Sequence, residues 1–183
     1  MDPAVVERAR GGDREAFTTL VGQVSDSLYA VAFRILRETA SAEDALQNAL
    51  ISTWQQLPHL RDVERFEAWS QRILVHACYA EFSRRRQFAA NVRVIDLNRA
   101  GASDGSRVLA DRDELDRAFR KIPVDQRAVF VMHHYVGLPL VEIAETLGIP
   151  AGTARSRLHN ATRALRTVMA AGALRTLEEG RPA

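Results

Sequence analysis

The chain has 183 residues, of which 46% are hydrophobic and 26% are charged, and its formal net charge is +2. This composition is typical of a globular protein with one domain or two small ones. The longest apolar runs are far shorter than the ~20 residues that a membrane-spanning helix needs, and no signal-peptide pattern is visible. The single cysteine, Cys78, rules out an internal disulfide and a zinc site built on paired cysteines. We therefore expect a soluble, cytoplasmic protein without membrane insertion.

The basic charge is concentrated towards the C-terminus. Residues 118–183 contain nine basic and five acidic side chains, whereas residues 1–95 contain twelve of each. A net positive segment is the electrostatic signature of a nucleic-acid-binding region. The charge distribution therefore predicts that the C-terminal part contacts nucleic acid.

Helical periodicity runs through most of the first ninety residues. Apolar residues recur every three or four positions over residues 17–36 and again over residues 42–57. Ser41 precedes the second run and is the candidate N-cap of its helix. A further helix is expected over residues 66–86. The residues expected to be buried on it are Trp69, Ile73, Ala77 and Phe82.

The helical pattern disappears over residues 89–110, where Gly, Ser, Asn and Asp accumulate, which predicts a flexible linker. Helical periodicity resumes after the linker in three short runs and a longer last one. Gly148 ends the third run, and Pro150 lies at the start of the last helix. Two helices joined by so short a turn are typical of a helix-turn-helix motif.

The expected fold is all-α, because no stretch alternates as a strand would. Two small helical domains are joined by the flexible linker, and the C-terminal domain contains the helix-turn-helix. The predicted boundaries are residues 1–88 for the first domain, 89–110 for the linker, 111–172 for the second domain and 173–183 for a tail.

The last predicted helix has an apolar stripe, from Ala154 to Val168, that is expected to pack into the core. Every side chain on the opposite face can donate a hydrogen bond, and none of them is acidic. Such a face suits the base edges and phosphates of a DNA major groove. The residues expected to contact DNA on this helix are Thr153, Arg155, Ser156, Arg157, His159, Asn160 and Arg163.

No catalytic or metal-binding pattern is recognisable. His76 and Cys78 offer too few ligands for zinc, and the adjacent His133 and His134 lack the spacing that would place two ligands on one helix face. No Gly-rich phosphate loop and no Ser/His/Asp arrangement is found. We therefore expect no catalytic activity, no metal and no cofactor.

Several segments closely resemble one protein family. The sequence LPLVEIAETLGIPAGTARSRL at residues 138–158 resembles the second conserved domain of the extracytoplasmic-function (ECF) sigma factors of bacterial RNA polymerase. IPVDQRAV at residues 122–129 resembles the start of that domain. AEDALQ at residues 42–47, the stretch over residues 66–73 and the arginines at 84–86 resemble the first conserved domain. Both domains in this order make the resemblance specific.

The resemblance implies a partner for each predicted surface. In the family, the helix that corresponds to residues 42–57 docks on the clamp coiled coil of the largest polymerase subunit. The residues expected to bind core polymerase are Glu43, Asp44, Gln47, Asn48, Ser52 and Gln55. The last helix would read the −35 element, and the loop and helix over residues 60–86 would bind the melted −10 element. The residues expected to bind the −10 element are Arg61, Arg65, Arg72, His76, Tyr79, Arg84, Arg85 and Arg86.

The sequence departs from the family pattern at a few positions. His76 and Ala80 stand where relatives commonly have Asn and Asp, which leaves the −10 base preference open. Ala154 stands in place of the usual valine, so less area is buried there. Asn160 and Thr162 stand where basic residues often occur, which predicts weaker phosphate contacts.

Two functions are compatible with this sequence. In the first, the protein is a sigma factor that binds core RNA polymerase, directs it to promoter DNA, assists promoter opening and is held by an anti-sigma factor. In the second, it is a free-standing helix-turn-helix regulator with an N-terminal dimerisation or sensor bundle, and it binds its operator alone. A bundle without a DNA function leaves the donor-rich face of the last helix unexplained. The sequence therefore favours the sigma factor.

Overall fold

The computed structural model describes the backbone of residues 1–92 and 117–179, and the side chains of residues 1–88, 117–168 and 170. Within these residues the regular structure is entirely helical, which confirms the predicted all-α class. The chain divides into two compact units, an N-terminal one with residues 1–86 and 145–148 and a C-terminal one with residues 87–144 and 149–183. Among the described helices, none is long and apolar enough to cross a membrane.

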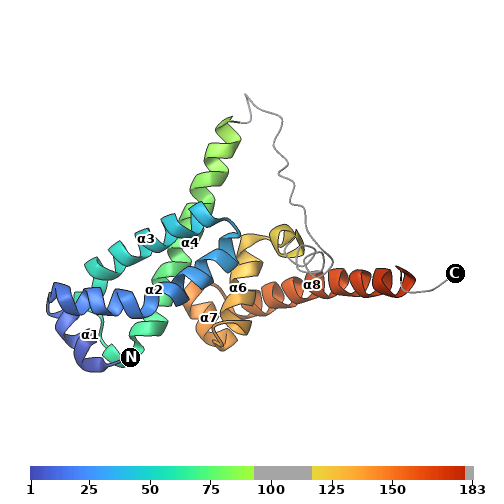
Figure 1. Cartoon of the computed structure of the whole chain (residues 1–183). Helices are drawn as coiled ribbons and strands as arrows, with labels where there is room; N and C mark the ends of the chain where they lie inside the picture. The colour runs from blue at the N-terminus through green and yellow to red at the C-terminus, as the bar shows by residue number, and fades with distance from the viewer. Residues whose placement is uncertain (93–116, 180–183) are drawn as a thin grey trace. The chain divides into compact units, whose positions relative to one another are not determined.

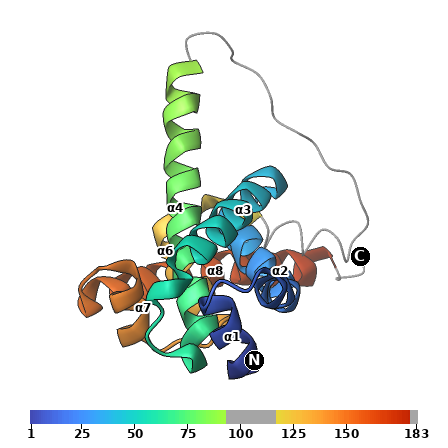
Figure 2. The same ribbon diagram turned by 90° about the vertical axis from the view of Figure 1, so that its left-hand side faces the viewer.

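The N-terminal unit contains the helices α1 to α4 (Figure 1). Helix α2 packs against α1 and α3, and the last turns of α4 extend beyond α2 and α3 in both ribbon views (Figure 2). Large apolar side chains, among them Leu20, Leu28 and Leu74, fill the core. The bounds are α1 (Pro3–Arg10), α2 (Arg14–Leu36), α3 (Thr39–Gln56) and α4 (Phe66–Val92), with 3-10 turns at Leu57–His59 and Val63–Arg65.

Helix α1 is absent from the sequence prediction, which overlooked the Asp2 N-cap and Pro3 in the first turn as signals of a helix start. Side-chain caps hold it in place. The Asp2 carboxylate accepts a hydrogen bond from the Ala4 N–H at 2.9 Å, and Asp13 caps α2 in the same way. The Ala16 N–H and the Arg8 guanidinium lower the pKa of Asp13. The helix is thus fixed by its caps, by the burial of Val6 and Ala9, and by ion pairs of Arg8 and Arg10.

The start of α3 corrects the prediction for Ser41. The helix begins at Thr39, so Ser41 lies within it and is only 3% exposed. Its hydroxyl donates to the Glu38 carboxylate at 2.7 Å and accepts from the Arg85 guanidinium at 2.6 Å. The N-cap prediction is therefore wrong, because this hydroxyl binds side chains rather than the backbone N–H groups at the helix start.

The buried stripe of α4 also differs from the prediction. Of the four residues expected to be buried, only Ile73 is, and Trp69, Ala77 and Phe82 are half-buried. The core contacts come instead from a stripe displaced around the helix, which leaves Trp69 and Ala77 at its edge. The buried residues of α4 are Phe66, Ser70, Ile73, Leu74, Val75, Cys78 and Glu81.

The C-terminal unit contains α6 (Val124–His134), α7 (Leu140–Leu147) and α8 (Ala151–Glu179), and residues 117–121 are also helical. Helix α6 packs against α8. Gly137 and Gly148 adopt φ values of 85° and 62°, where glycine is favoured, and they follow α6 and α7. The sequence analysis predicts the helix end at Gly148. The core cluster consists of Ala118, Ile122, Ala161 and Leu165, with Phe119, Phe130 and Val168 packed against it.

The predicted linker at residues 89–110 lies outside the described residues except for 89–92, which continue α4. The described part of the predicted tail, residues 173–179, continues α8. Both helices are therefore longer than the sequence pattern predicts.

Candidate nucleic-acid interface

The helix-turn-helix is formed by α7, a three-residue turn and α8. Gly148 gives the turn its left-handed residue, and the Ile149 N–H donates to the Ala144 carbonyl at 3.0 Å. The Pro150 carbonyl accepts from the N–H groups of Thr153 and Ala154 at 2.9 and 3.1 Å. Backbone hydrogen bonds thus fix the point at which α8 begins.

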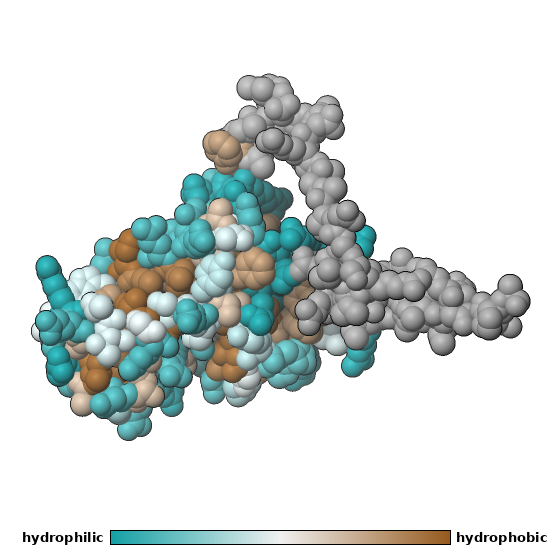
Figure 3. Space-filling model, viewed as in Figure 1, coloured by the Kyte–Doolittle hydropathy of each residue, from teal (hydrophilic) through white to brown (hydrophobic). Residues whose placement is uncertain are grey.

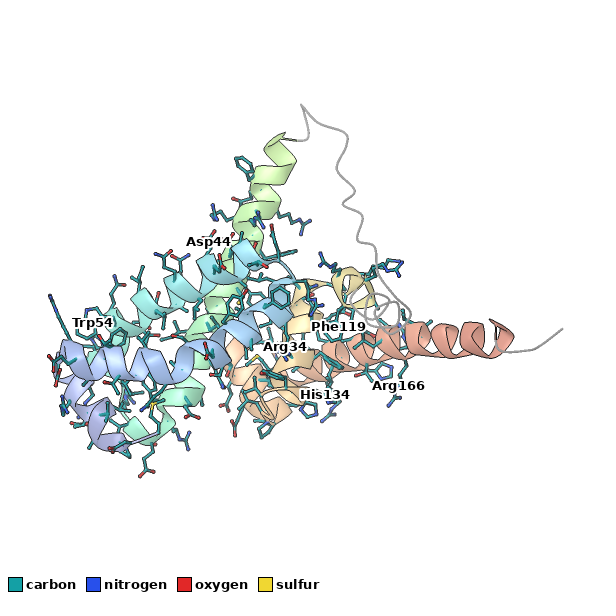
Figure 4. The ribbon with its side chains drawn as sticks, viewed as in Figure 1. Arg34, Asp44, Trp54, Phe119, His134 and Arg166 are labelled. Carbon is teal, nitrogen blue, oxygen red and sulfur yellow. The ribbon has the colours of Figure 1, made fainter. Side chains whose placement is uncertain are left out.

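Helix α8 presents the predicted DNA-contacting residues on its surface. Arg155, Ser156, His159 and Arg163 are exposed, while Thr153, Arg157 and Asn160 are half-buried. No acidic residue occurs in the α8 sequence before Glu178. A shallow hollow of about 360 Å³ lies along the helix beside His159, Arg163 and Arg166, and Figure 4 shows Arg166 extending from α8. This surface offers hydrogen-bond donors and positive charge to a ligand.

Arg157 differs from its neighbours on α8. Its Nε lies 3.0 Å from the Asp125 carboxylate of α6, so the guanidinium ties the two helices together. Arg155 and Arg163 have no ion-pair partner in the part of the chain that the structure describes. Of these three arginines, Arg155 and Arg163 are therefore free to reach DNA, whereas Arg157 is occupied within the unit.

The outer face of α3 carries the residues predicted to bind core polymerase. Glu43, Asp44, Gln47, Asn48 and Gln55 are exposed and Ser52 is half-buried. Figure 3 shows apolar surface among the hydrophilic side chains over α2 and α3.

Ile51 lies within this polar face and is 50% exposed. The sequence analysis missed it because it counted only polar side chains. Ile51 lies three or four positions from Gln47, Asn48 and Gln55, and this spacing could have placed it on the same helix face.

An open pocket of about 640 Å³ lies between α3 and α4. It brings together residues that the sequence analysis assigned to different surfaces. Asn48 and Ser52, predicted to bind polymerase, face the same pocket as Arg72 and His76, predicted to bind the −10 element. The other lining residues are Gln56, Trp69, Ile73, Ala77 and Ala80.

An ion-pair network joins α3 to the far half of α4. The Glu81 carboxylate, 3% exposed, accepts from Nε and Nη2 of Arg84 at 2.9 Å each and raises the pKa of that guanidinium. Arg84 also donates to Asp44 at 3.1 Å, and Figure 4 labels Asp44 on α3. Arg85 pairs with the Glu38 carboxylate. Two of the three adjacent arginines are thus held by carboxylates.

The remaining residues predicted to bind the −10 element do not line the pocket between α3 and α4. Arg61 and Arg65 are exposed, and Tyr79 is half-buried on α4. Nε of Arg65 lies 3.4 Å from a carboxylate oxygen of Asp62. Arg86 is exposed and has no ion-pair partner among the described residues. Phe88, which follows it by two residues and was not among the predicted contacts, is 70% exposed.

The cysteine and histidines have local roles. Burial raises the pKa of Cys78 to about 12, so its thiolate is scarce at neutral pH. Burial and the neighbouring His133 lower the pKa of His134, and Nδ1 of His133 lies 3.0 Å from the Leu138 carbonyl oxygen. Over residues with described side chains, no group of three potential ligands could hold a metal.

Family comparisons match both units of the chain. The family described as Sigma-70 region 2 matches residues 20–88, and Sigma-70, region 4 matches residues 112–165. The RNA polymerase sigma-E factor of Streptomyces avermitilis is 30% identical over 155 residues, which cover 85% of this chain and 86% of that protein. The ECF RNA polymerase sigma factor SigW of Bacillus subtilis is 25% identical over 175 residues, covering 88% and 92%.

The chain therefore belongs to the ECF sigma factors of bacterial RNA polymerase, the class of initiation factor to which the sequence resemblance pointed. Its role is in transcription initiation, and its relatives are regulatory subunits rather than catalysts.

Solved structures share the fold. The sigma factor RpoE of Bartonella quintana, solved in complex with the anti-sigma factor NepR, has a TM-score of 0.67 at 22% identity and covers 84% of this chain and 96% of its own. CnrH, solved in complex with the cytosolic domain of CnrY, has a TM-score of 0.65 at 21% identity and covers 93% and 97%.

Proposed function

We propose that this protein is a dissociable sigma subunit that reads the −35 element with α8, binds the melted −10 element with α4 and docks on core polymerase through α3. The observation that carries the proposal is the surface of α8, where exposed donors and unpaired arginines follow a tight turn. An α-helix fits the DNA major groove, and arginine fits the O6 and N7 acceptors of guanine. The face of α8 suits this task in both shape and charge.

The α3 face suits a protein partner better than DNA. Glu43 is exposed and has no ion-pair partner among the described residues, and carboxylates repel phosphate. Exposed amides surround Ile51, so the face combines a small apolar centre with a polar surround, which is the usual anatomy of a protein interface. A basic helix of the polymerase would meet complementary charge there.

The pocket between α3 and α4 suits an unstacked base. Trp69 is half-buried at its wall and Arg72 is exposed beside it. An aromatic wall next to a cation is the arrangement by which proteins hold single-stranded nucleic acid. A sigma factor needs such a site because opening a promoter exposes bases of one strand.

Three further features belong to this proposal. The chain acts in the cytoplasm, where bacterial RNA polymerase works, and it has no catalytic activity of its own. RpoE and CnrH were each solved with a partner, which for RpoE is an anti-sigma factor. The shared fold supports the proposal that this chain, too, is held inactive by an anti-sigma factor.

A mobility-shift experiment with and without core polymerase tests the proposed function. Labelled genomic promoter fragments are titrated with the purified chain alone and with the chain plus core enzyme. We expect specific retention only when core is present, because the −10 surface acts on melted DNA. Specific retention by the chain alone, unchanged by core, would favour the free-standing regulator.

A further inference from the structure

The connection between α3 and α4, residues 57–65, is anchored in the core and exposed between its anchors. Leu60 is buried, and so is Phe66, the first residue of α4. Arg61 and Arg65 lie between these two residues and are exposed. Both arginines are thus carried by a short stretch of backbone that the core holds only on either side.

Helix α1 lies against this connection (Figure 2) and contacts both of its 3-10 turns. Arg10, the last residue of α1, is half-buried. Its Nη1 donates a hydrogen bond to the Leu60 carbonyl oxygen at 3.2 Å, and its Nη2 donates to the Glu7 carboxylate. One nitrogen of the guanidinium is therefore tied to its own helix, while the other holds the backbone of the connection.

This hydrogen bond acts directly on Arg61, because the Leu60 carbonyl and the Arg61 N–H belong to one planar peptide group. A donor that fixes the carbonyl therefore fixes the plane from which Arg61 leaves the core. Arg61 has no hydrogen-bond or ion-pair partner among the described residues, whereas Arg65 lies beside Asp62. The direction of the Arg61 side chain thus depends on its backbone.

A fixed backbone favours binding, since a loop that must be ordered on association reduces the net affinity. We infer that Arg10 is a positioning residue for the melted −10 strand: it holds the Leu60 carbonyl and so directs Arg61 towards a DNA phosphate. The inference rests on the proposed function, which assigns this strand to the N-terminal unit. It makes promoter binding depend on α1, although Arg10 itself does not touch the DNA.

The test uses holoenzyme reconstituted from the full chain and core polymerase, on a promoter fragment recovered by run-off transcription. Affinity is measured at several salt concentrations for Arg61→Ala, Arg10→Ala, the double variant and the original chain. Arg61→Ala should reduce the slope of log affinity against log salt concentration by about 0.7, the contribution of one phosphate contact on a single strand. Arg10→Ala should cause most of the same reduction. The double variant should bind within about twofold of Arg61→Ala, because both changes remove one contact.

Arg8→Ala is the matched control, because Arg8 lies on the same helix and pairs with Asp13 rather than with the connection. It removes the same charge and should leave the slope unchanged. Arg10→Lys keeps the charge but lacks the planar fork, so it should share the reduced slope. The unfolding midpoint and the affinity for core polymerase are measured alongside, so that a loss of folding or assembly is recognised.

Four results would overturn the inference. If Arg61→Ala leaves the slope unchanged, Arg61 makes no phosphate contact that could be positioned. If Arg10→Ala lowers only the unfolding midpoint, Arg10 supports the fold alone. If the losses of the two single variants add in the double variant, Arg10 contacts DNA itself. If Arg8→Ala reduces the slope equally, or Arg10→Lys leaves it unchanged, charge rather than position is the cause.

In all four cases the proposed function stands, because the original holoenzyme still binds the promoter. If the original holoenzyme neither binds nor initiates on any fragment, the proposed function fails and the inference fails with it.

Discussion

Ile51 is an apolar residue at the centre of a polar helix face. Half of its surface is exposed, and amide side chains lie one turn away on either side. Apolar residues ringed by polar ones commonly provide much of the free energy of a protein interface. Ile51 is thus the residue of α3 on which polymerase binding should depend most.

Replacing Ile51 tests this role. Ile51→Ser should weaken binding to core polymerase by about 1–2 kcal/mol, because apolar area no longer becomes buried at the interface. Fluorescence anisotropy of the labelled chain, titrated with core enzyme, measures the loss. Ile51→Val keeps most of the apolar surface and is the matched control. Equal affinities for the serine variant and the original chain would show that the partner does not cover this residue.

Two arginines of α8 should respond differently to replacement, because Arg157 has an ion-pair partner and Arg163 has none among the described residues. If the Arg163 guanidinium reads a base, Arg163→Ala should reduce the binding free energy at cognate −35 elements by roughly 1–3 kcal/mol. Arg157→Ala should chiefly lower the stability of the unit, because it removes the ion pair with Asp125. Holoenzyme affinity on cognate and mutated −35 elements, together with thermal unfolding, distinguishes the two. If Arg163→Ala weakens binding equally on every DNA, Arg163 contacts phosphate rather than a base.

At the scale of helices, the network of Glu38, Asp44, Glu81, Arg84 and Arg85 gives α4 a structural as well as a functional role. Glu81 is buried, and Arg84 satisfies both of its oxygens. Removing one member of such a pair leaves a charge that the protein has withdrawn from water. The network therefore positions the far half of α4 against the start of α3.

This arrangement predicts different effects for neighbouring arginines. Arg86→Ala should reduce the slope of log affinity against log salt concentration by about one unit, the contribution of one phosphate contact. The reason is that Arg86 is exposed and has no partner among the described residues. Arg84→Ala should leave the slope nearly unchanged and lower the unfolding midpoint of the chain. Holoenzyme binding to promoter DNA at several salt concentrations gives the slopes. Equal changes of slope for both variants would show that Arg84 also contacts a DNA phosphate.

Helices with strong local signals were predictable from the sequence. Gly148 marks the end of α7. Ala154, Ala161 and Leu165 of the apolar stripe of α8 are buried as its periodicity predicts, while Leu158 and Val168 are half-buried. Helix α1 was missed although Asp2 and Pro3 mark its start, because its apolar face is short and buries only Val6 and Ala9. The burial of Glu81 in α4 was not predictable, because it depends on Arg84 and on packing against another helix.

For the molecule as a whole, the predicted contact residues come from α3, α4, the segment before α4, and α8, and some of those on α3 and α4 line one pocket. The sequence placed the donors of α8 and the polar residues of α3 each on one helix, where the structure exposes most of them, and their contacts stay predictions. It did not predict the pocket, because Asn48 and Arg72 come together only when α3 packs beside α4. Sites formed by one helix follow from periodicity, while sites formed between helices require tertiary structure.

Family membership and surface chemistry lead to one central claim, that the chain confers promoter-specific initiation on core polymerase. Neither unit carries a recognisable catalytic pattern within its described side chains, and the exposed polar faces suit binding. Its relatives are RNA polymerase sigma factors, so we expect the chain to support transcription in combination with core polymerase.

Run-off transcription by purified core RNA polymerase, with and without this protein, on a library of genomic fragments tests the claim most directly. The account predicts specific transcripts that appear only when the protein is added and that share −35 and −10 sequences upstream of their start sites. Absence of any new transcript, with specific fragments retained by the protein alone in a gel, would contradict it.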